Sequence, residues 1–148
     1  MRILIYIHSL ECGGAERVIS LLSNNWVKKG YDLKIISNVS PETDFYEISK
    51  KINRDFLKTS GKNKFLIILK RLFLLNKKIR DFKPDFALTF MTTANLNYIL
   101  SNFLTPKHVH IISERTNPNN QKLCFLKKIS RIFLYWFPSI LVVQTKNI

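Results

Sequence analysis

The residues with the clearest chemical potential are two adjacent glycines, Gly13 and Gly14, which separate an apolar run from an amphipathic segment. The apolar run, residues 2–8, predicts a β-strand, and residues 15–29 carry apolar side chains at helical spacing. In doubly wound α/β proteins such a turn brings backbone N–H groups and a helix N-terminus up to a phosphate. The glycine spacing fits neither the dinucleotide fingerprint nor the P-loop. We expect a phosphorylated ligand here, and a plain chain reversal is the alternative.

A second group of candidate residues follows three of the predicted strands, at the sheet edge where ligands bind in doubly wound folds. These candidate site residues are Ser9, Met91, Thr92, Thr93, Glu114 and Arg115. An exposed ion pair between Glu114 and Arg115 would contribute little to stability. Their position after a strand therefore favours a role in a site.

Strand and helix patterns alternate along the whole chain. Strands are predicted at residues 2–8, 32–39, 54–58, 85–90, 109–113 and 139–145, and helices at residues 15–29, 63–82, 94–104 and 121–137. Residues 41–44 form a polar turn, and residues 45–52 are ambiguous. This alternation predicts a Rossmann-like, doubly wound parallel sheet in three α/β/α layers. A length of 148 residues fits one such domain.

Four short motifs follow one another in a fixed order. They are Gly-Gly-Ala-Glu-Arg-Val from residue 13, Lys-Gly-Tyr-Asp-Leu from residue 29, Pro-Asp at residues 84–85 and Ser-Glu-Arg-Thr-Asn-Pro from residue 113. With these motifs the chain, from residue 1 to about residue 144, resembles the N-terminal domain of glycosyltransferase family 4. That family is retaining and has the GT-B fold, and the members most similar to this chain build bacterial surface polysaccharides.

The resemblance implies a reaction and assigns the candidate residues to its two substrates. A sugar would pass from a nucleotide-sugar donor, which is a substrate and not a cofactor, to a lipid-linked glycan or polysaccharide acceptor. Gly13 and Gly14 would contact the donor diphosphate, and the six residues after the strands would lie on the acceptor side. Many relatives have a histidine after the fourth strand, where this chain has Phe-Met-Thr-Thr from residue 90. The acceptor-binding group and the catalytic residues therefore stay open.

The resemblance also implies that residues 1–148 form the acceptor-side domain alone. In GT-B enzymes a C-terminal domain makes most contacts with the donor nucleotide, and nothing in this sequence corresponds to it. We therefore expect the chain to be inactive by itself, either as a truncated product or as half of a split enzyme. A non-catalytic binding module that keeps the fold and a membrane surface is the alternative.

The chain is strongly basic, with 24 Lys and Arg against 10 Asp and Glu and a net charge of +14. Residues 58–83 hold nine of these basic side chains, one acid and more apolar residues than a single core-facing stripe needs. Such a helix is typical of the membrane interface, although a solvated helix face is the alternative. Lysines and aromatic residues also mix around residues 122–137. The proposed membrane-surface residues are Lys70, Arg71, Lys77, Lys78, Lys127 and Lys128.

Several other classes of protein are disfavoured by the sequence. The basic residues mix with aliphatic ones and form no recognition motif, so we expect no nucleic-acid partner. No run is long and apolar enough to span a bilayer or to act as a signal peptide. We therefore expect a cytoplasmic protein, peripheral at the inner face of the cell membrane. Isolated Cys12 and Cys124 predict neither a disulfide nor a metal site. His108 and His110 lie within or just before the fifth strand, and we expect one to face the core and the other a helix.

Overall fold

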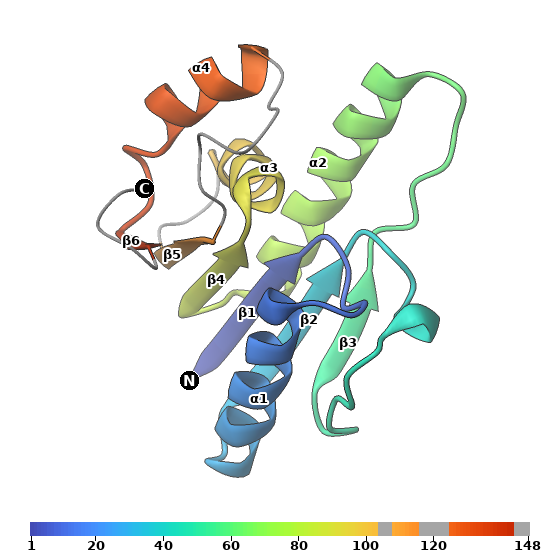
Figure 1. The fold of residues 1–148 in the computed structure, drawn as a ribbon, viewed down its shortest axis with the longest axis vertical. Coiled ribbons are helices and arrows are strands. Elements are labelled where there is room, and N and C mark those ends of the chain that lie inside the picture. Colours follow the sequence, from blue (N-terminus) through green and yellow to red (C-terminus); the bar gives the residue numbers. More distant parts are fainter. Residues whose placement is uncertain (104–107, 116–124, 144–148) are drawn as a thin grey trace.

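The fold is a six-stranded, fully parallel sheet with helices on its two faces (Figure 1). The computed structural model describes residues 1–103, 108–115 and 125–143, and the side chains of all of these except residues 125–128. The strand order is β3-β2-β1-β4-β5-β6, which is the order of the doubly wound Rossmann-like sheet. The predicted fold class is confirmed.

The elements lie close to their predicted positions. The strands are β1 (Arg2–Ile7), β2 (Asp32–Ser37), β3 (Asn53–Phe56), β4 (Phe86–Phe90), β5 (Val109–Glu114) and β6 (Ile140–Val143), and the helices are α1 (Gly14–Lys28), the short 3-10 helix η1 (Pro41–Thr43), α2 (Lys64–Phe82), α3 (Thr92–Asn102) and α4 (Phe125–Leu134). Helix α3 begins two residues earlier than predicted. Helix α4 is shorter than the predicted segment 121–137, whose first four residues lie outside the described part of the chain.

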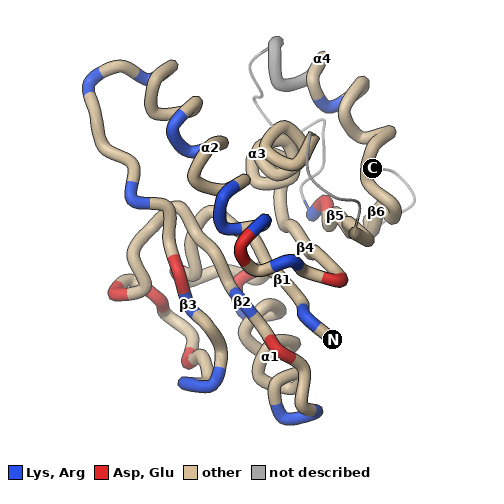
Figure 2. Tube along the Cα trace, turned by 180° about the vertical axis from the view of Figure 1, so that it is seen from behind, with Lys and Arg blue, Asp and Glu red and all other residues tan. Residues whose placement is uncertain are grey.

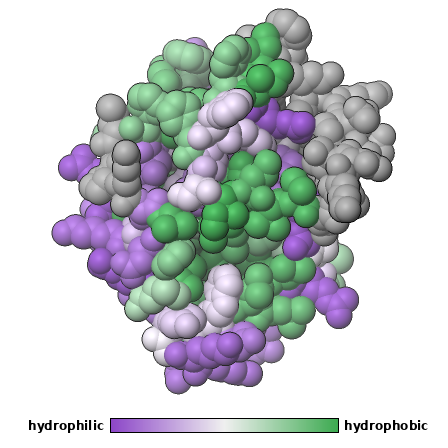
Figure 3. All heavy atoms as spheres, turned by 90° about the vertical axis from the view of Figure 1, so that its left-hand side faces the viewer, coloured by the Kyte–Doolittle hydropathy of each residue, from purple (hydrophilic) through white to green (hydrophobic). Residues whose placement is uncertain are grey.

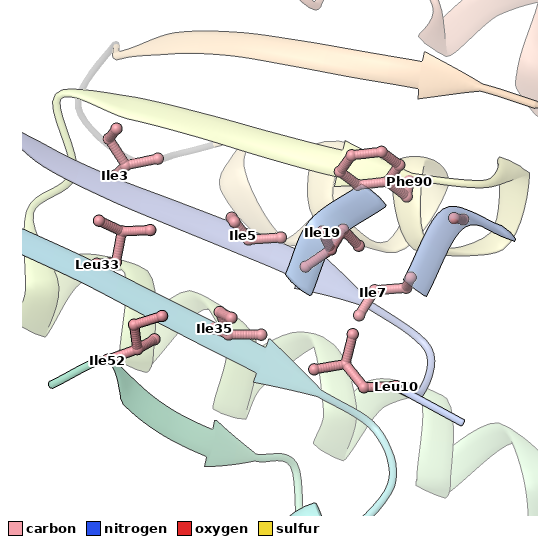
Figure 4. Packing of buried hydrophobic residues seen from close by; sticks show 10 residues of the cluster. Ile3, Ile5, Ile7, Leu10, Ile19, Leu33, Ile35, Ile52 and Phe90 are labelled. Carbon is pink, nitrogen blue, oxygen red and sulfur yellow. The ribbon is translucent and has the colours of Figure 1, made fainter. Parts of the chain in front are cut away.

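One half of the core lies between α1 and the sheet. Alternate residues of the first strand, Ile3, Ile5 and Ile7, point toward α1 and pack with Ile19 of that helix (Figure 4). Further residues from α1, β2, β4 and the adjoining loops complete this cluster: Leu10, Ala15, Leu33, Ile35, Ile52 and Phe90. Helix α1 stops where the sequence predicts, because Gly30 adopts φ +83, a left-handed conformation that glycine adopts without strain.

The other half of the core lies under α2 and α3. Leu4 and Tyr6 point to this face and pack with Tyr98 of α3 and with Leu75 and Ile79 of α2. Leu75 and Ile79 are the buried residues of α2, and both lie in its C-terminal half. The N-terminal half of α2 extends past the strands (Figure 1) and leaves apolar side chains exposed. The surplus of apolar residues predicted for this helix is therefore present on its surface.

The α1 side of the sheet is covered unevenly. The register aligns Ile5, Leu88, Ile111 and Ile140 in one row across β1, β4, β5 and β6 on the α1 side. Ile5 is fully buried, whereas Ile140 is 48% exposed. Apolar side chains gather in a broad patch on the side of the molecule that carries α4 and β6 (Figure 3). Because parallel sheets are normally buried on both faces, this half of the α1 side is suited to contact with further polypeptide.

Candidate functional site

The glycine turn forms the N-terminus of α1. Gly13 is the N-cap residue, and its carbonyl accepts the backbone N–H of Arg17 at 3.0 Å. Gly13 has φ −178, which any residue can adopt, so the chain reversal does not require glycine there. A Cβ on Gly14 would meet no atom within 4 Å, whereas a Cβ on Gly13 would collide with the carboxylate of Glu16. The two glycines therefore leave room beside the backbone, and Glu16 fills that room at Gly13.

Helix α1 starts beside the point where the sheet changes direction. The chain runs outward from β1 to β2 and β3 and then returns to the other side of β1 as β4. Crevices at such switch points, beyond the carboxyl ends of the strands, bind ligands in open α/β sheets. The ends of β1 and β4 lead directly into the glycine turn and into α3. The glycine turn after β1 and the candidate residues after β4 therefore lie at the same edge of the sheet, the edge formed by the carboxyl ends of the strands.

Met91, between β4 and α3, has a strained backbone. Its φ of 71 and ψ of 147 lie in a region that glycine occupies and other residues avoid, and such a conformation costs roughly 1–3 kcal/mol. Two hydrogen bonds hold it, from its own N–H to the Ser113 carbonyl and from the Asn95 N–H to its carbonyl, each at 3.0 Å. Strain of this kind concentrates at functional sites, which agrees with the choice of Met91 as a candidate.

A buried carboxylate at the end of β5 connects α3 with the residue that follows α4. Glu114 is 2% exposed, and its Oε2 accepts the hydroxyls of Thr92 at 2.9 Å and Tyr135 at 2.6 Å. Its other oxygen, Oε1, is buried and has no hydrogen-bond partner among the residues that the structure describes. Burial and the bond to Glu114 raise the pKa of the Tyr135 phenol well above its usual range, so Tyr135 keeps its proton. A buried carboxylate oxygen with unused capacity is a natural acceptor for a ligand hydroxyl.

The bonds behind Glu114 form a directed chain. The Asn95 amide donates from Nδ2 to the Tyr135 hydroxyl at 3.1 Å and accepts the Thr89 hydroxyl on Oδ1 at 2.7 Å. Because the Thr89 hydroxyl donates its proton to Asn95, it must accept a hydrogen bond from His110 Nε2, 3.0 Å away. His110 is therefore a neutral imidazole with its proton on Nε2. These hydrogen bonds come from β4, β5 and α3 and from the residue after α4. Together they hold the Glu114 carboxylate in one orientation.

The neutral state of His110 predicts how stability depends on pH. Burial and the neighbouring His108 lower the pKa of His110 from 6.5 to about 3. Below pH 6.5 this residue binds a proton in the unfolded chain but not in the folded chain. The free energy of unfolding therefore falls as the pH drops from 6.5 toward 3. We expect this residue to remove about 2 kcal/mol of the free energy of unfolding between pH 7 and pH 5, as measured by urea unfolding.

The matched variants are His110→Gln and His8→Gln. The first should flatten the pH dependence, because it removes the buried imidazole. The second should keep it, because His8 is exposed in the folded chain. An unchanged slope in the His110→Gln variant would contradict the assignment.

The remaining predicted site residues have separate positions. Ser9 is buried in the β1–α1 loop, where its hydroxyl donates to Glu11 at 3.3 Å. Arg115 lies with its guanidinium 5.5 Å from the centre of the Phe90 ring, and its buried Nε makes no hydrogen bond within the described part of the chain. Thr93 lies in the first turn of α3 and is partly buried. Two of the predicted residues meet directly, because the Thr92 hydroxyl donates a hydrogen bond to the Glu114 carboxylate.

The predicted membrane-surface residues of α2 divide into two pairs. Lys70 and Lys77 are exposed, and basic residues follow the length of this helix (Figure 2). Lys78 instead forms an ion pair with Asp55 of β3, and Arg71 is partly buried with its Nε unpaired. Burial raises the pKa of Asp55, but the bond and charge of Lys78 outweigh it and hold that pKa below its usual value. The side chains of Lys127 and Lys128 lie outside the described residues.

Tyr135, Asn95 and Thr89 were not predicted as parts of the site, and the expectation that the two histidines face different surroundings is wrong. Side chains two positions apart on an extended segment point to the same side, and His108 immediately precedes β5. Both imidazoles pack against the Tyr98 ring, and His108 Nε2 lies 2.6 Å from the Tyr98 hydroxyl. The sequence did contain one signal for this network: hydroxyl and amide residues stand at inward positions of α3. A buried polar side chain needs a hydrogen-bond partner, so such residues indicate a buried network.

Within residues 1–103, 108–115 and 125–143, His, Cys, Asp and Glu side chains do not gather in groups of three or more that could hold a metal ion. Among the helices described, none combines the length and the apolar character needed to cross a bilayer.

Comparisons with known proteins extend these observations. No protein-family model matches the chain. The chain is 29% identical over 140 residues to the Campylobacter jejuni GalNAc-alpha-(1->4)-GalNAc-alpha-(1->3)-diNAcBac-PP-undecaprenol alpha-1,4-N-acetyl-D-galactosaminyltransferase, and the match covers 90% of this chain and 38% of that protein. The chain thus spans well under half of the length of this curated relative.

Solved structures support the fold. MurG from Acinetobacter baumannii matches with a TM-score of 0.67 and 13% identity, over 99% of this chain and 42% of that one. A protein from Listeria monocytogenes described as a UDP-N-acetylglucosamine 2-epimerase matches with a TM-score of 0.71 and 16% identity, over 99% and 40% of the two chains. The chain therefore has the Rossmann-like fold of a GT-B domain and is similar in sequence to a glycosyltransferase.

Proposed function

We propose that this chain is the N-terminal, acceptor-side domain of a retaining, family 4 glycosyltransferase that transfers a sugar from a nucleotide-sugar donor to a lipid-linked glycan. The observation that carries the proposal is the similarity to the galactosaminyltransferase, because it extends over 140 residues. The name of that relative describes an acceptor joined through diphosphate to undecaprenol. An acceptor of this class would explain why a basic, partly apolar surface accompanies the fold.

In this proposal the two substrates approach the same edge of the sheet. The donor diphosphate lies against the backbone of Gly13 and Gly14, where the N-terminus of α1 favours a negative charge. Glu16 now occupies part of that space, so its side chain rotates away when the diphosphate binds. Oε1 of Glu114 is buried in the structure, so in this proposal it becomes accessible when the acceptor binds and then receives a hydroxyl of the acceptor glycan. Ser9, Met91, Thr92, Thr93 and Arg115 border the acceptor.

The membrane surface belongs to α2 in this proposal. Its N-terminal half exposes Phe65, Leu66, Ile68 and Leu69 beside exposed lysines. Apolar and basic side chains on one helix suit the boundary between anionic headgroups and hydrocarbon. The chain would then act from the inner face of the cell membrane, where activated sugars are present.

A further polypeptide completes the enzyme in this proposal. The exposed apolar row ending at Ile140 supports such a contact. A second Rossmann-like domain would supply most donor contacts, so the chain by itself has no transferase activity. Transfer of labelled sugar to a lipid extract tests this, with the chain alone and mixed with such a domain. Activity in the mixture alone supports the split enzyme, whereas inactivity of both favours a non-catalytic binding module.

The glycine turn can be tested on the chain by itself with inorganic pyrophosphate, the group that nucleotide-sugar donors share. Gly14→Ala should weaken pyrophosphate binding by about tenfold, because the new methyl group occupies the space the ligand needs. The fold should persist, since a Cβ at Gly14 meets no atom. Amide chemical shifts of the α1 N-terminus report binding, and Asn25→Ala, an exposed change in the same helix, is the control. Unmoved amides of Gly13 and Gly14 would overturn the assignment.

A further inference from the structure

Helices α2, α3 and α4 enclose an apolar groove. The groove has a volume of about 620 Å³, within the range of pockets that bind small molecules. Its walls consist of residues from all three helices and the end of α3: Leu72, Phe73, Asn76, Arg80, Leu100, Ser101, Phe103 and Leu134. Most of this lining is aliphatic or aromatic. The groove is therefore suited to a hydrocarbon group.

The shape of the groove is held by contacts between its walls. The Asn76 amide donates to the Ser101 carbonyl and joins α2 to α3. The ring of Phe103, at the end of the groove, is itself held from outside by an edge-to-face contact with Phe137, with ring centres 5.4 Å apart. These contacts fix the groove before any ligand enters, which lowers the cost of binding.

The rim of the groove is apolar on one side and basic on the other. Phe73 is 70% exposed and Leu100 is 48% exposed, so a chain lying in the groove continues into an apolar surface. Arg80 is the charged residue of the lining, and Lys77 lies one turn before it on the exposed side of α2. An anionic head and an apolar tail would thus meet complementary surfaces at the same time.

We propose that the groove binds one acyl chain of an anionic phospholipid, with the phosphate beside Arg80 and Lys77. This inference rests on the proposed membrane surface and makes it more specific: α2 holds an individual lipid as well as lying on the headgroups. The basic side chains favour bulk phospholipid over the acceptor carrier, because they are spread along the whole helix. A spread of charge matches many phosphates, whereas a single diphosphate would need a compact cluster.

The test uses monomeric lysophosphatidic acid, below its micelle concentration, titrated into the full chain and followed by amide chemical shifts. The shifts should map to the groove, and lysophosphatidylcholine, whose head carries no net charge, should bind at least tenfold more weakly. Leu100→Asp should reduce lysophosphatidic acid binding at least tenfold, because it places a negative charge on the apolar wall. Leu21→Asp changes another exposed leucine, on α1, and should leave binding unchanged.

Two further measurements distinguish the ways in which the lipid proposal could be wrong. Arg80→Gln should reduce lysophosphatidic acid binding about fivefold and abolish the preference over lysophosphatidylcholine. If farnesyl phosphate binds the groove and lysophosphatidic acid does not, the acyl assignment is wrong and the ligand of the groove is an isoprenoid. Shifts that avoid the groove would overturn the site itself. Pyrophosphate binding at the glycine turn should be the same in Leu100→Asp, so the transferase proposal and the lipid proposal can fail separately.

Discussion

Replacing Lys70 and Lys77 by glutamate should release the chain from anionic vesicles in a flotation experiment. Each exposed basic residue near an anionic surface contributes about 1 kcal/mol, and the double reversal changes four charges. The expected loss is about 4 kcal/mol, or roughly a thousandfold in partitioning. Both side chains are exposed, so the fold should be unaffected, and circular dichroism can verify this.

The matched control is Lys50→Glu with Lys51→Glu, which changes the net charge equally. Both lysines are exposed in the loop before β3, away from α2. This variant should still float. Equal release of both double variants would mean that net charge alone drives binding, and retention of the α2 variant would remove α2 from the membrane surface. Lys78 is left intact because its ion pair with Asp55 supports the fold.

The second large effect is expected at Glu114. Replacement by alanine removes the carboxylate that accepts the hydroxyls of Thr92 and Tyr135, and a buried donor left unsatisfied, here the Tyr135 hydroxyl, costs about 1–3 kcal/mol. We expect Glu114→Ala to lower the free energy of unfolding by about 3 kcal/mol, as measured by urea unfolding at pH 7. Glu114→Gln keeps an oxygen that can accept both hydroxyls, so its loss should stay near 1 kcal/mol, about that of one hydrogen bond.

The glutamine variant also separates stability from function. If Oε1 receives an acceptor hydroxyl, Glu114→Gln should lower kcat/KM for the acceptor by about tenfold to a hundredfold in the transfer assay, since a bond to a charged group is lost. Tyr135→Phe is the control: it removes one donor to Oε2 and leaves Oε1 unchanged. Stability in Glu114→Ala equal to that of the unmodified chain would show that the network has no structural role.

Much of the fold can be predicted from sequence because the relevant interactions are local. The alternating isoleucines of β1 and the spacing of apolar residues in α1 define which side of each element is buried. The glycine at position 30 fixes the end of α1 through its own backbone preference. Six strands linked by helices allow few arrangements, since parallel strands need right-handed crossovers. The basic and apolar excess of α2 is likewise a property of one segment.

What the sequence determined is therefore the set of elements, their order, the glycine turn and the charge of α2. The tertiary structure decided which side chains meet. Tyr135 lies 21 residues after Glu114 on another element, and Lys78 reaches Asp55 across 23 residues, so no local pattern signals either pair. The strain at Met91 arises only when α3 and β5 hold its backbone together. Periodicity records which face of an element is buried, but partners are chosen by the packing of those faces in three dimensions.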